Sequence, residues 1–214
     1  MFDIDSHLRP LSTDGLTVVD GPPADAPAKA AKAQLRLVRR VEKRRFVRLQ
    51  ARRSAAAAIG RLPKRGESIH GVMDTSYSAW SLAEAVIELL NEPVRELVIG
   101  TLGFNRPNAE ALCELLDQKQ LKRVLLMVSD YFRSSDRTIF ADIRESLESR
   151  GQRVAVTRSH AKLLLLRTKN RNVVIETSAN LRSSQNWEQF VLSDDRRLLR
   201  FHQAWIEQLC QSSD

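Results

Sequence analysis

The chain has 214 residues, of which 43% are hydrophobic and 28% charged, enough for one large domain or for a domain with an extension. No apolar run approaches the ~20 residues of a membrane span, and the first residues lack the basic-then-apolar pattern of a secretory signal. We therefore expect a cytoplasmic protein without a membrane partner. Cys113 and Cys210 form no metal-ligand spacing and no glycine-rich phosphate loop occurs, so we expect neither a metal nor a cofactor.

The net charge of +8 is unevenly distributed. Between Lys29 and Arg65 there are 14 Lys and Arg residues against one acid, Glu42, a net of +13, which leaves −5 for the rest of the chain. This asymmetry predicts a basic arm for a polyanion rather than a generally basic surface.

Composition predicts three segments. Residues 1–28 combine scattered aspartates with prolines and show no sustained period, which is typical of a flexible acidic tail. Residues 29–66 form the predicted basic helical arm and linker, because helix-forming residues continue without Gly or Pro until Gly60. Residues 67–214 are the predicted folded domain.

A helix as cationic as this arm repels itself unless an anion lies close. Nucleic-acid phosphates are the favoured partner, DNA more than RNA, because Lys and Arg release condensed counterions there. A helix packed on the acidic body or on a second subunit, and an anionic membrane surface, are the alternatives. The arginines assigned to substrate binding are Arg36, Arg40, Arg44, Arg48 and Arg52.

Within the domain, strand-like and helix-like stretches alternate, which predicts an α/β sandwich with a mixed β-sheet. Strands are expected at 68–75, 96–102, 122–129, 153–157, 160–168, 172–177 and 189–193, and helices at 80–91, 107–117, 136–150 and 194–208. The strands 160–168 and 172–177 flank the polar turn 169–171 and are expected to form a hairpin.

Polar residues cluster around this hairpin. His160 and Lys162, two apart on the expected strand, should share a face, where an imidazole can attack or carry a proton and an ammonium can neutralise a phosphate. Ser178 and Asn180 follow the next strand and can donate to phosphate oxygens, and Glu188 can orient a histidine. The plain alternative is an edge histidine with a surface lysine and polar loop residues.

Together, His160-Ala161-Lys162, Thr177-Ser178-Ala179-Asn180 and Asn186-Trp187-Glu188 resemble the catalytic half-motif of the phospholipase D superfamily. The resemblance covers roughly residues 68–209 and excludes the tail and the arm. It implies a metal-independent phosphodiesterase or nuclease, with His160 forming a phosphohistidine, Lys162 and Asn180 holding phosphate oxygens, Ser178 assisting and Glu188 supporting a histidine. Because the family needs two such motifs and this chain has one, it also implies a homodimer, as in the small bacterial endonucleases of this superfamily.

The chain departs from the motif at two positions. Arg167 stands where the motif has Asp, and Thr177 where it has Gly; the spacing from His160 to Asn180 is also about three residues longer than usual. A catalytically silent, phospholipase D-like nucleic-acid-binding protein is therefore the alternative reading, and hydrolysis of lipid phosphodiesters is a third. Trp187 can stack on a base or pack. The stretches Asp130-Tyr131-Phe132-Arg133 and Asn105-Arg106 follow strand ends and can line a groove or be merely solvated.

Overall fold

The computed structural model describes residues 47–182 and 186–212. Their centre is a seven-stranded mixed sheet in the order β1-β7-β6-β5-β2-β3-β4. The strands are β1 (Ser68–Met73), β2 (Glu96–Thr101), β3 (Val124–Ser129), β4 (Arg153–Thr157), β5 (Leu163–Arg167), β6 (Asn172–Thr177) and β7 (Glu188–Asp194). Strands β2, β3 and β4 are parallel, and every other pairing is antiparallel.

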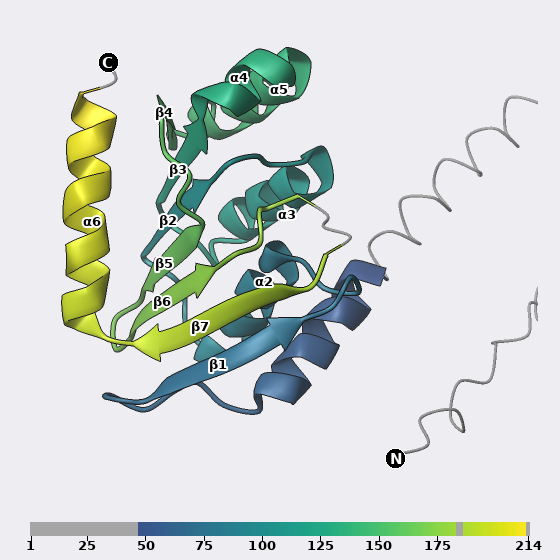
Figure 1. Cartoon of the computed structure of the whole chain (residues 1–214), viewed down its shortest axis with the longest axis vertical. Helices are drawn as coiled ribbons and strands as arrows, with labels where there is room; N and C mark the ends of the chain where they lie inside the picture. Colours follow the sequence, from purple (N-terminus) through teal and green to yellow (C-terminus); the bar gives the residue numbers. More distant parts are fainter. Residues whose placement is uncertain (1–46, 183–185, 213–214) are drawn as a thin grey trace, which may run out of the picture. The chain divides into compact units, whose positions relative to one another are not determined.

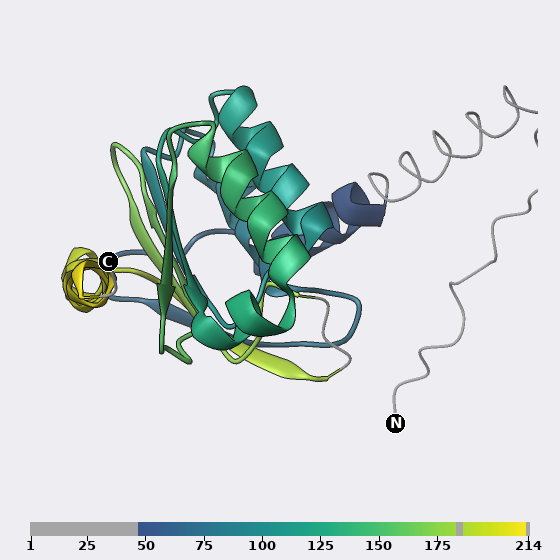
Figure 2. The same ribbon diagram turned by 90° about the horizontal axis from the view of Figure 1, so that it is seen from above.

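Helices cover both faces of this sheet, as Figures 1 and 2 show. One face carries α2 (Ala79–Leu90), α3 (Arg106–Asp117), α4 (Asp130–Ser135) and α5 (Arg137–Glu148); the other carries α6 (Arg196–Gln211). The predicted α/β sandwich with a mixed sheet is confirmed. In the part of the chain that the structure describes, no helix is both long and apolar enough to cross a bilayer.

The sheet separates two apolar cores because side chains alternate along each strand. On β5, Leu164 and Leu166 point into the core below α2, α3 and α5, whereas Leu163 and Leu165 pack with α6. All four are buried, which explains why β5 reads as an unbroken leucine run rather than an alternating pattern.

Capping residues fix where the helices begin. Ser78 and Ser81 form a reciprocal capping box at the start of α2, and the Asn105 side chain accepts from the Asn108 N–H at the start of α3. Asp195 caps α6 by accepting from two backbone N–H groups, so this helix begins later than the predicted residue 194, and Asp194 remains in β7.

The predicted helix 136–150 is confirmed as α5, which begins at Arg137, and an unpredicted short helix, α4, capped by the Ser129 side chain, precedes it. One local expectation was wrong: His160 was expected on a strand, but β5 begins at Leu163. The chain between β4 and β5 is therefore a connection, and His160 lies in it.

The helix over residues 47–59 packs on the domain, although its residues were grouped with the arm. Ala55 and Ala56 are buried against Ala85 of α2, since small side chains allow the two helices to approach closely. Residues 1–46, which hold the predicted tail and most of the arm, lie outside the described residues.

Strand β1 is an edge strand and contains one close approach. Gly71 pairs with Phe190 of β7, and the Phe190 ring lies over it. A Cβ atom at position 71 would lie 2.4 Å from two ring atoms of Phe190. Glycine is needed here for space rather than for backbone conformation, because its φ is not positive.

Candidate active site

Polar residues gather at one edge of the sheet, where several strands begin or end. The parallel strands β2, β3 and β4 finish there at Thr101, Ser129 and Thr157. The antiparallel partners bring the start of β5, the end of β6 and the start of β7 to the same edge. We call this edge the polar edge. Crevices outside the carboxyl ends of parallel strands are where open α/β sheets commonly bind ligands.

His160 and Lys162 lie together at the polar edge. Lys162 Nζ is 3.2 Å from His160 Nδ1 and 3.2 Å from the His160 carbonyl oxygen. His160 is exposed and Lys162 is half-buried. Because a protonated lysine only donates, this contact makes Nδ1 the acceptor and leaves the proton of a neutral ring on Nε2. An anion that attracts Lys162 would release the Nδ1 lone pair.

Backbone pairing ties the serine and the glutamate to this pair. The Thr177 N–H donates to the Lys162 carbonyl over 3.1 Å, which carries the β5–β6 ladder up to the lysine. The Ser178 hydroxyl donates to Glu188 Oε2 and accepts from the Gln189 N–H over 3.0 Å. The partner of Glu188 in this arrangement is thus Ser178, and the serine joins β6 to β7.

Asn180 makes a contact that the motif does not imply. Its Oδ1 accepts from the Leu102 N–H over 3.2 Å, so the side chain bridges the segment after β6 to the end of β2. Its amide nitrogen remains the group with which it can donate to a phosphate oxygen.

Sequence reasoning missed a second bridge, made by Thr101. The Thr101 Oγ1 accepts from the Leu181 N–H over 3.2 Å and donates to the Gly103 carbonyl over 2.9 Å. Next to it, the Ser129 hydroxyl donates to the Leu102 carbonyl over 2.7 Å. The sequence signal for these bridges was a residue with a hydroxyl group, Thr101 or Ser129, at the end of each apolar run. The hydrogen bonds hold the segments after β2 and β6 against the ends of β2 and β3.

Arg167, at the position of the missing motif aspartate, is remote from His160. It ends β5 at the opposite edge of the sheet, where its Nη2 and Nε lie 2.6 and 2.9 Å from Glu96 Oε2. Glu96 is the directly opposed residue on β2. The substitution therefore creates a cross-strand ion pair and changes no contact at the polar edge.

Two of the arginines assigned to substrate are engaged within the fold. Arg48 lies 2.6 Å from Glu114 and 3.5 Å from Glu84, and Arg52 lies 2.8 Å from Glu88. For these two, the alternative of a helix packed on the acidic body describes the contacts. The other three, Arg36, Arg40 and Arg44, lie outside the described residues.

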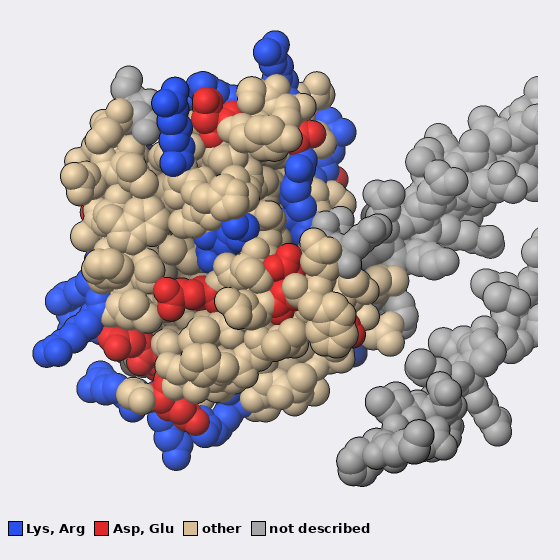
Figure 3. All heavy atoms as spheres, viewed as in Figure 1, with Lys and Arg blue, Asp and Glu red and all other residues tan. Residues whose placement is uncertain are grey.

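The described body carries no continuous basic stripe on the face that Figure 3 shows, where basic and acidic side chains form separate small groups among uncharged atoms. Two arginines beside the polar edge are engaged in ion pairs, Arg133 with Asp130 and Arg182 with Asp136. Lys162 and the exposed Arg158, which follows β4, are the cations closest in sequence to His160.

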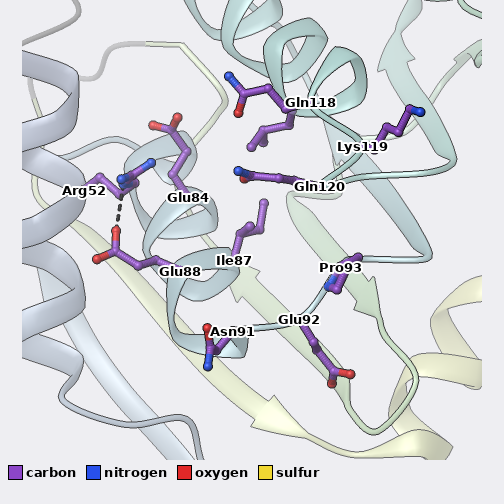
Figure 4. A pocket seen from close by; sticks show the side chains of 11 residues that line it. Arg52, Glu84, Ile87, Glu88, Asn91, Glu92, Pro93, Gln118, Lys119 and Gln120 are labelled. Atoms are coloured by element: carbon purple, nitrogen blue, oxygen red, sulfur yellow. Dashed lines mark ion pairs between the residues drawn. The ribbon is translucent and has the colours of Figure 1, made fainter.

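A hollow of about 450 Å³ lies elsewhere, between the helix over residues 47–59, α2 and the turn that follows α3. Figure 4 shows the Arg52–Glu88 pair on one wall and Gln118 and Gln120 reaching toward Glu84 across it. Burial raises the pKa of the Glu84 carboxyl to about 7, against the lowering effect of Arg48 and Arg52. The hollow is bounded by residues that precede β2 and β3, so it belongs to the edge opposite the polar edge.

Solved structures with similar folds include Nuc from Salmonella typhimurium, a phospholipase D family member, and NucT from Helicobacter pylori. The match to Nuc has a TM-score of 0.50 at 15% identity and covers 69% of this chain and 96% of Nuc. The match to NucT has a TM-score of 0.52 at 13% identity and covers 68% of this chain and 98% of NucT. No protein-family model and no curated protein sequence matches the chain significantly.

These matches confirm the predicted phospholipase D-like fold. They also show that one copy of the fold in this chain corresponds to nearly the whole of Nuc or NucT.

Proposed function

We propose that this chain, which has a phospholipase D-like fold, is a metal-independent phosphodiesterase that cuts DNA or RNA through a phosphohistidine on His160. The contact between Lys162 Nζ and His160 Nδ1, 3.2 Å apart at an exposed edge of the sheet, carries the proposal. It supports the proposal because an imidazole that can act as a nucleophile lies next to an ammonium group that can bind a phosphate. The motif resemblance implies that the reaction needs no metal ion.

The proposed reaction has two steps. A phosphate that binds Lys162 and the Asn180 amide draws the lysine away from the ring, and an imidazole nitrogen of His160 attacks phosphorus. The P–O bond to the leaving strand breaks, and the leaving oxygen takes a proton from a second histidine. Water then attacks the phosphohistidine, gives its proton back to that second histidine, and releases His160.

The second histidine is proposed to be the His160 of a second copy. The other described histidines do not fit the task. His70 lies on edge strand β1. His202 is a buried residue of α6, and its Nδ1 accepts from Trp205 Nε1 over 3.1 Å. A two-fold axis at the polar edge would bring two copies of His160 together.

The test is incubation of labelled DNA and RNA, each single- and double-stranded, with excess chelator. The wild type should cut at least one substrate, and His160→Ala should lose cleavage by at least about 1000-fold because it removes the attacking group. Since His160 is exposed, the variant should unfold at the same urea concentration as the wild type.

A wild type that cuts none of the four substrates would refute catalysis. If it then still bound nucleic acid, with an affinity that falls with salt and survives His160→Ala, the catalytically silent binding protein would be the correct reading.

A further inference from the structure

Two large aromatic side chains at the polar edge are left open to solvent. Trp187, directly before β7, is 73% exposed, and Tyr131, the second residue of α4, is 70% exposed. Burying rings of this size normally stabilises a fold, and the exposure of these two means that they contribute little of that stabilisation here.

By the sheet register, the chain positions of Trp187 and Tyr131 lie close to the row of residues that holds His160 and Lys162. Gly100 pairs with Leu163, Leu163 with Glu176, and Thr177 with Phe190, so Ala161 lies level with Gln189 across β6. In the same way, Ser129 lies level with Leu102, the residue after β2, and with Ala161, shortly before β5. Trp187 and Tyr131 each stand two residues beyond this row, and His160 stands one residue beyond it.

The strand order places the chain positions of Trp187 and Tyr131 beside strands on opposite sides of β5. Strand β7 lies two strands from β5 in one direction, and β3 lies two strands from it in the other, as Figure 1 shows. At about 4.8 Å between neighbouring strands, β7 and β3 each lie about 10 Å from β5 and about 19 Å from each other. About six stacked nucleotides span that distance at about 3.4 Å each, and fewer do so in an extended strand.

We propose that the substrate is single-stranded nucleic acid, held by stacking of its bases on Trp187 and Tyr131 on either side of the phosphodiester that reaches His160. This rests on the proposed function and specifies its substrate. In a duplex each base face is covered by its neighbours, and only base edges and backbone are open to the protein. An unpaired strand offers base faces, and aromatic platforms bind these without regard to sequence.

Binding is the direct test, in the full-length chain carrying His160→Ala so that no substrate is cut. Trp187→Ala and Tyr131→Ala should each weaken the binding of a short single-stranded DNA or RNA by roughly 5- to 100-fold, the usual effect of losing one stacked base. Trp187→Phe and Tyr131→Phe keep a ring and should retain most of the affinity. Duplex binding should change by less than about twofold in all four variants.

Moderate salt sharpens the test, because it weakens the contribution of a basic arm to phosphates more than it weakens stacking. Phe201→Ala is the matched control. Phe201 is 65% exposed but lies on α6, which covers the other face of the sheet from α4, so its loss should leave binding unchanged. Sedimentation must show the same oligomeric state for the variants as for their parent.

Single-stranded affinity that is unchanged in both alanine variants overturns the proposal, and so does an equal loss in Phe201→Ala. A wild type that cuts duplex as fast as single strands, with no effect of either alanine, would support the proposed function and overturn this inference. A wild type that cuts nothing, but shows the predicted binding pattern, would refute catalysis and support the stacking site.

Discussion

At the scale of single residues, the main departure from the phospholipase D motif makes its contacts away from the candidate site. Arg167 stands where the motif has an aspartate, and on this ground the sequence alone offered a catalytically silent protein as the alternative. In the fold, Arg167 and its partner Glu96 lie at the far edge of the sheet, and Gln203 of α6 also donates to Glu96 over 3.0 Å. Arg167 thus serves the packing of β2, β5 and α6.

Restoring the motif by Arg167→Asp should therefore harm stability and leave catalysis alone. The change sets two carboxylates against each other across the β2–β5 ladder, so the free energy of unfolding should fall by about 1–2 kcal/mol. Urea titration measures this. Adding Glu96→Gln removes the repulsion and should recover part of the loss, and higher cleavage by Arg167→Asp would contradict this account.

At the scale of elements, the helix over residues 47–59 is joined to α2 and α3 by charges as well as by small apolar side chains. Arg48 faces Glu84 and Glu114, and Arg52 faces Glu88. Glu84 is 5% exposed, and its pKa of about 7 lies above the ordinary 4.5, because burial penalises its charged form more than the arginines favour it. The junction is thus sensitive to pH near neutrality.

The sign of this pH dependence follows from the raised pKa. The folded chain holds the Glu84 proton more tightly than the unfolded chain does, so the stabilisation is complete below about pH 4.5 and is lost as the pH rises through about 7. The loss is on the order of 3–4 kcal/mol, since the shift from 4.5 to about 7 is about 2.5 units and one unit of pKa corresponds to about 1.4 kcal/mol.

Glu84→Gln should remove this dependence. Urea unfolding of the wild type and the variant between pH 5 and pH 8 should give curves that diverge, with the variant relatively more stable at pH 8. The other ionisable groups are common to both proteins, so their contributions cancel in the difference. Parallel curves would show that Glu84 stays charged throughout.

At the scale of the whole molecule, the order of the strands determines which residues meet at the candidate site. It brings the start of β5, the end of β6 and the start of β7 beside the ends of β2 and β3, and it supplies a single His160–Lys162 pair per chain. A phosphodiesterase that needs two histidines must then use two chains.

Mixing tests this dependence. If wild-type and His160→Ala chains are combined in equal amounts and exchanged fully, about a quarter of the dimers contain two wild-type chains. Cleavage per total chain should then fall to about a quarter of the pure wild-type rate, whereas independent sites would give about half. Refolding the two forms together, followed by a rate assay, distinguishes the two outcomes.

Much of this fold was predictable, because buried runs and strong caps are local signals. The runs at β2 and β3 and the hairpin of β5 and β6 were found with errors of one to three residues at their ends. The motif spacing also singled out His160, Lys162, Ser178 and Glu188, which lie at the polar edge, and their roles there stay a prediction. The short helix α4 was missed because six residues directly after a strand are too few to show a helical period.

Contacts that depend on sheet order were beyond the sequence. The Asn180–Leu102 bridge joins positions far apart in the chain, and nothing near either residue predicts it. Arg48 and Arg52 are chemically identical to the other arginines of the predicted arm, and only the position of α2 and α3 shows that they bind carboxylates. Roles that arise from tertiary neighbours have no local signal.

The Phe190 ring over Gly71 has a consequence for chains that share this sheet. The ring fills the space that any side chain at position 71 would need, since a Cβ atom there would approach it to 2.4 Å. Neither position can enlarge alone, because core packing leaves no room for the clash to relax without moving an edge strand. In related chains the two positions should therefore vary as a pair, a larger residue at 71 occurring only with a smaller one at 190.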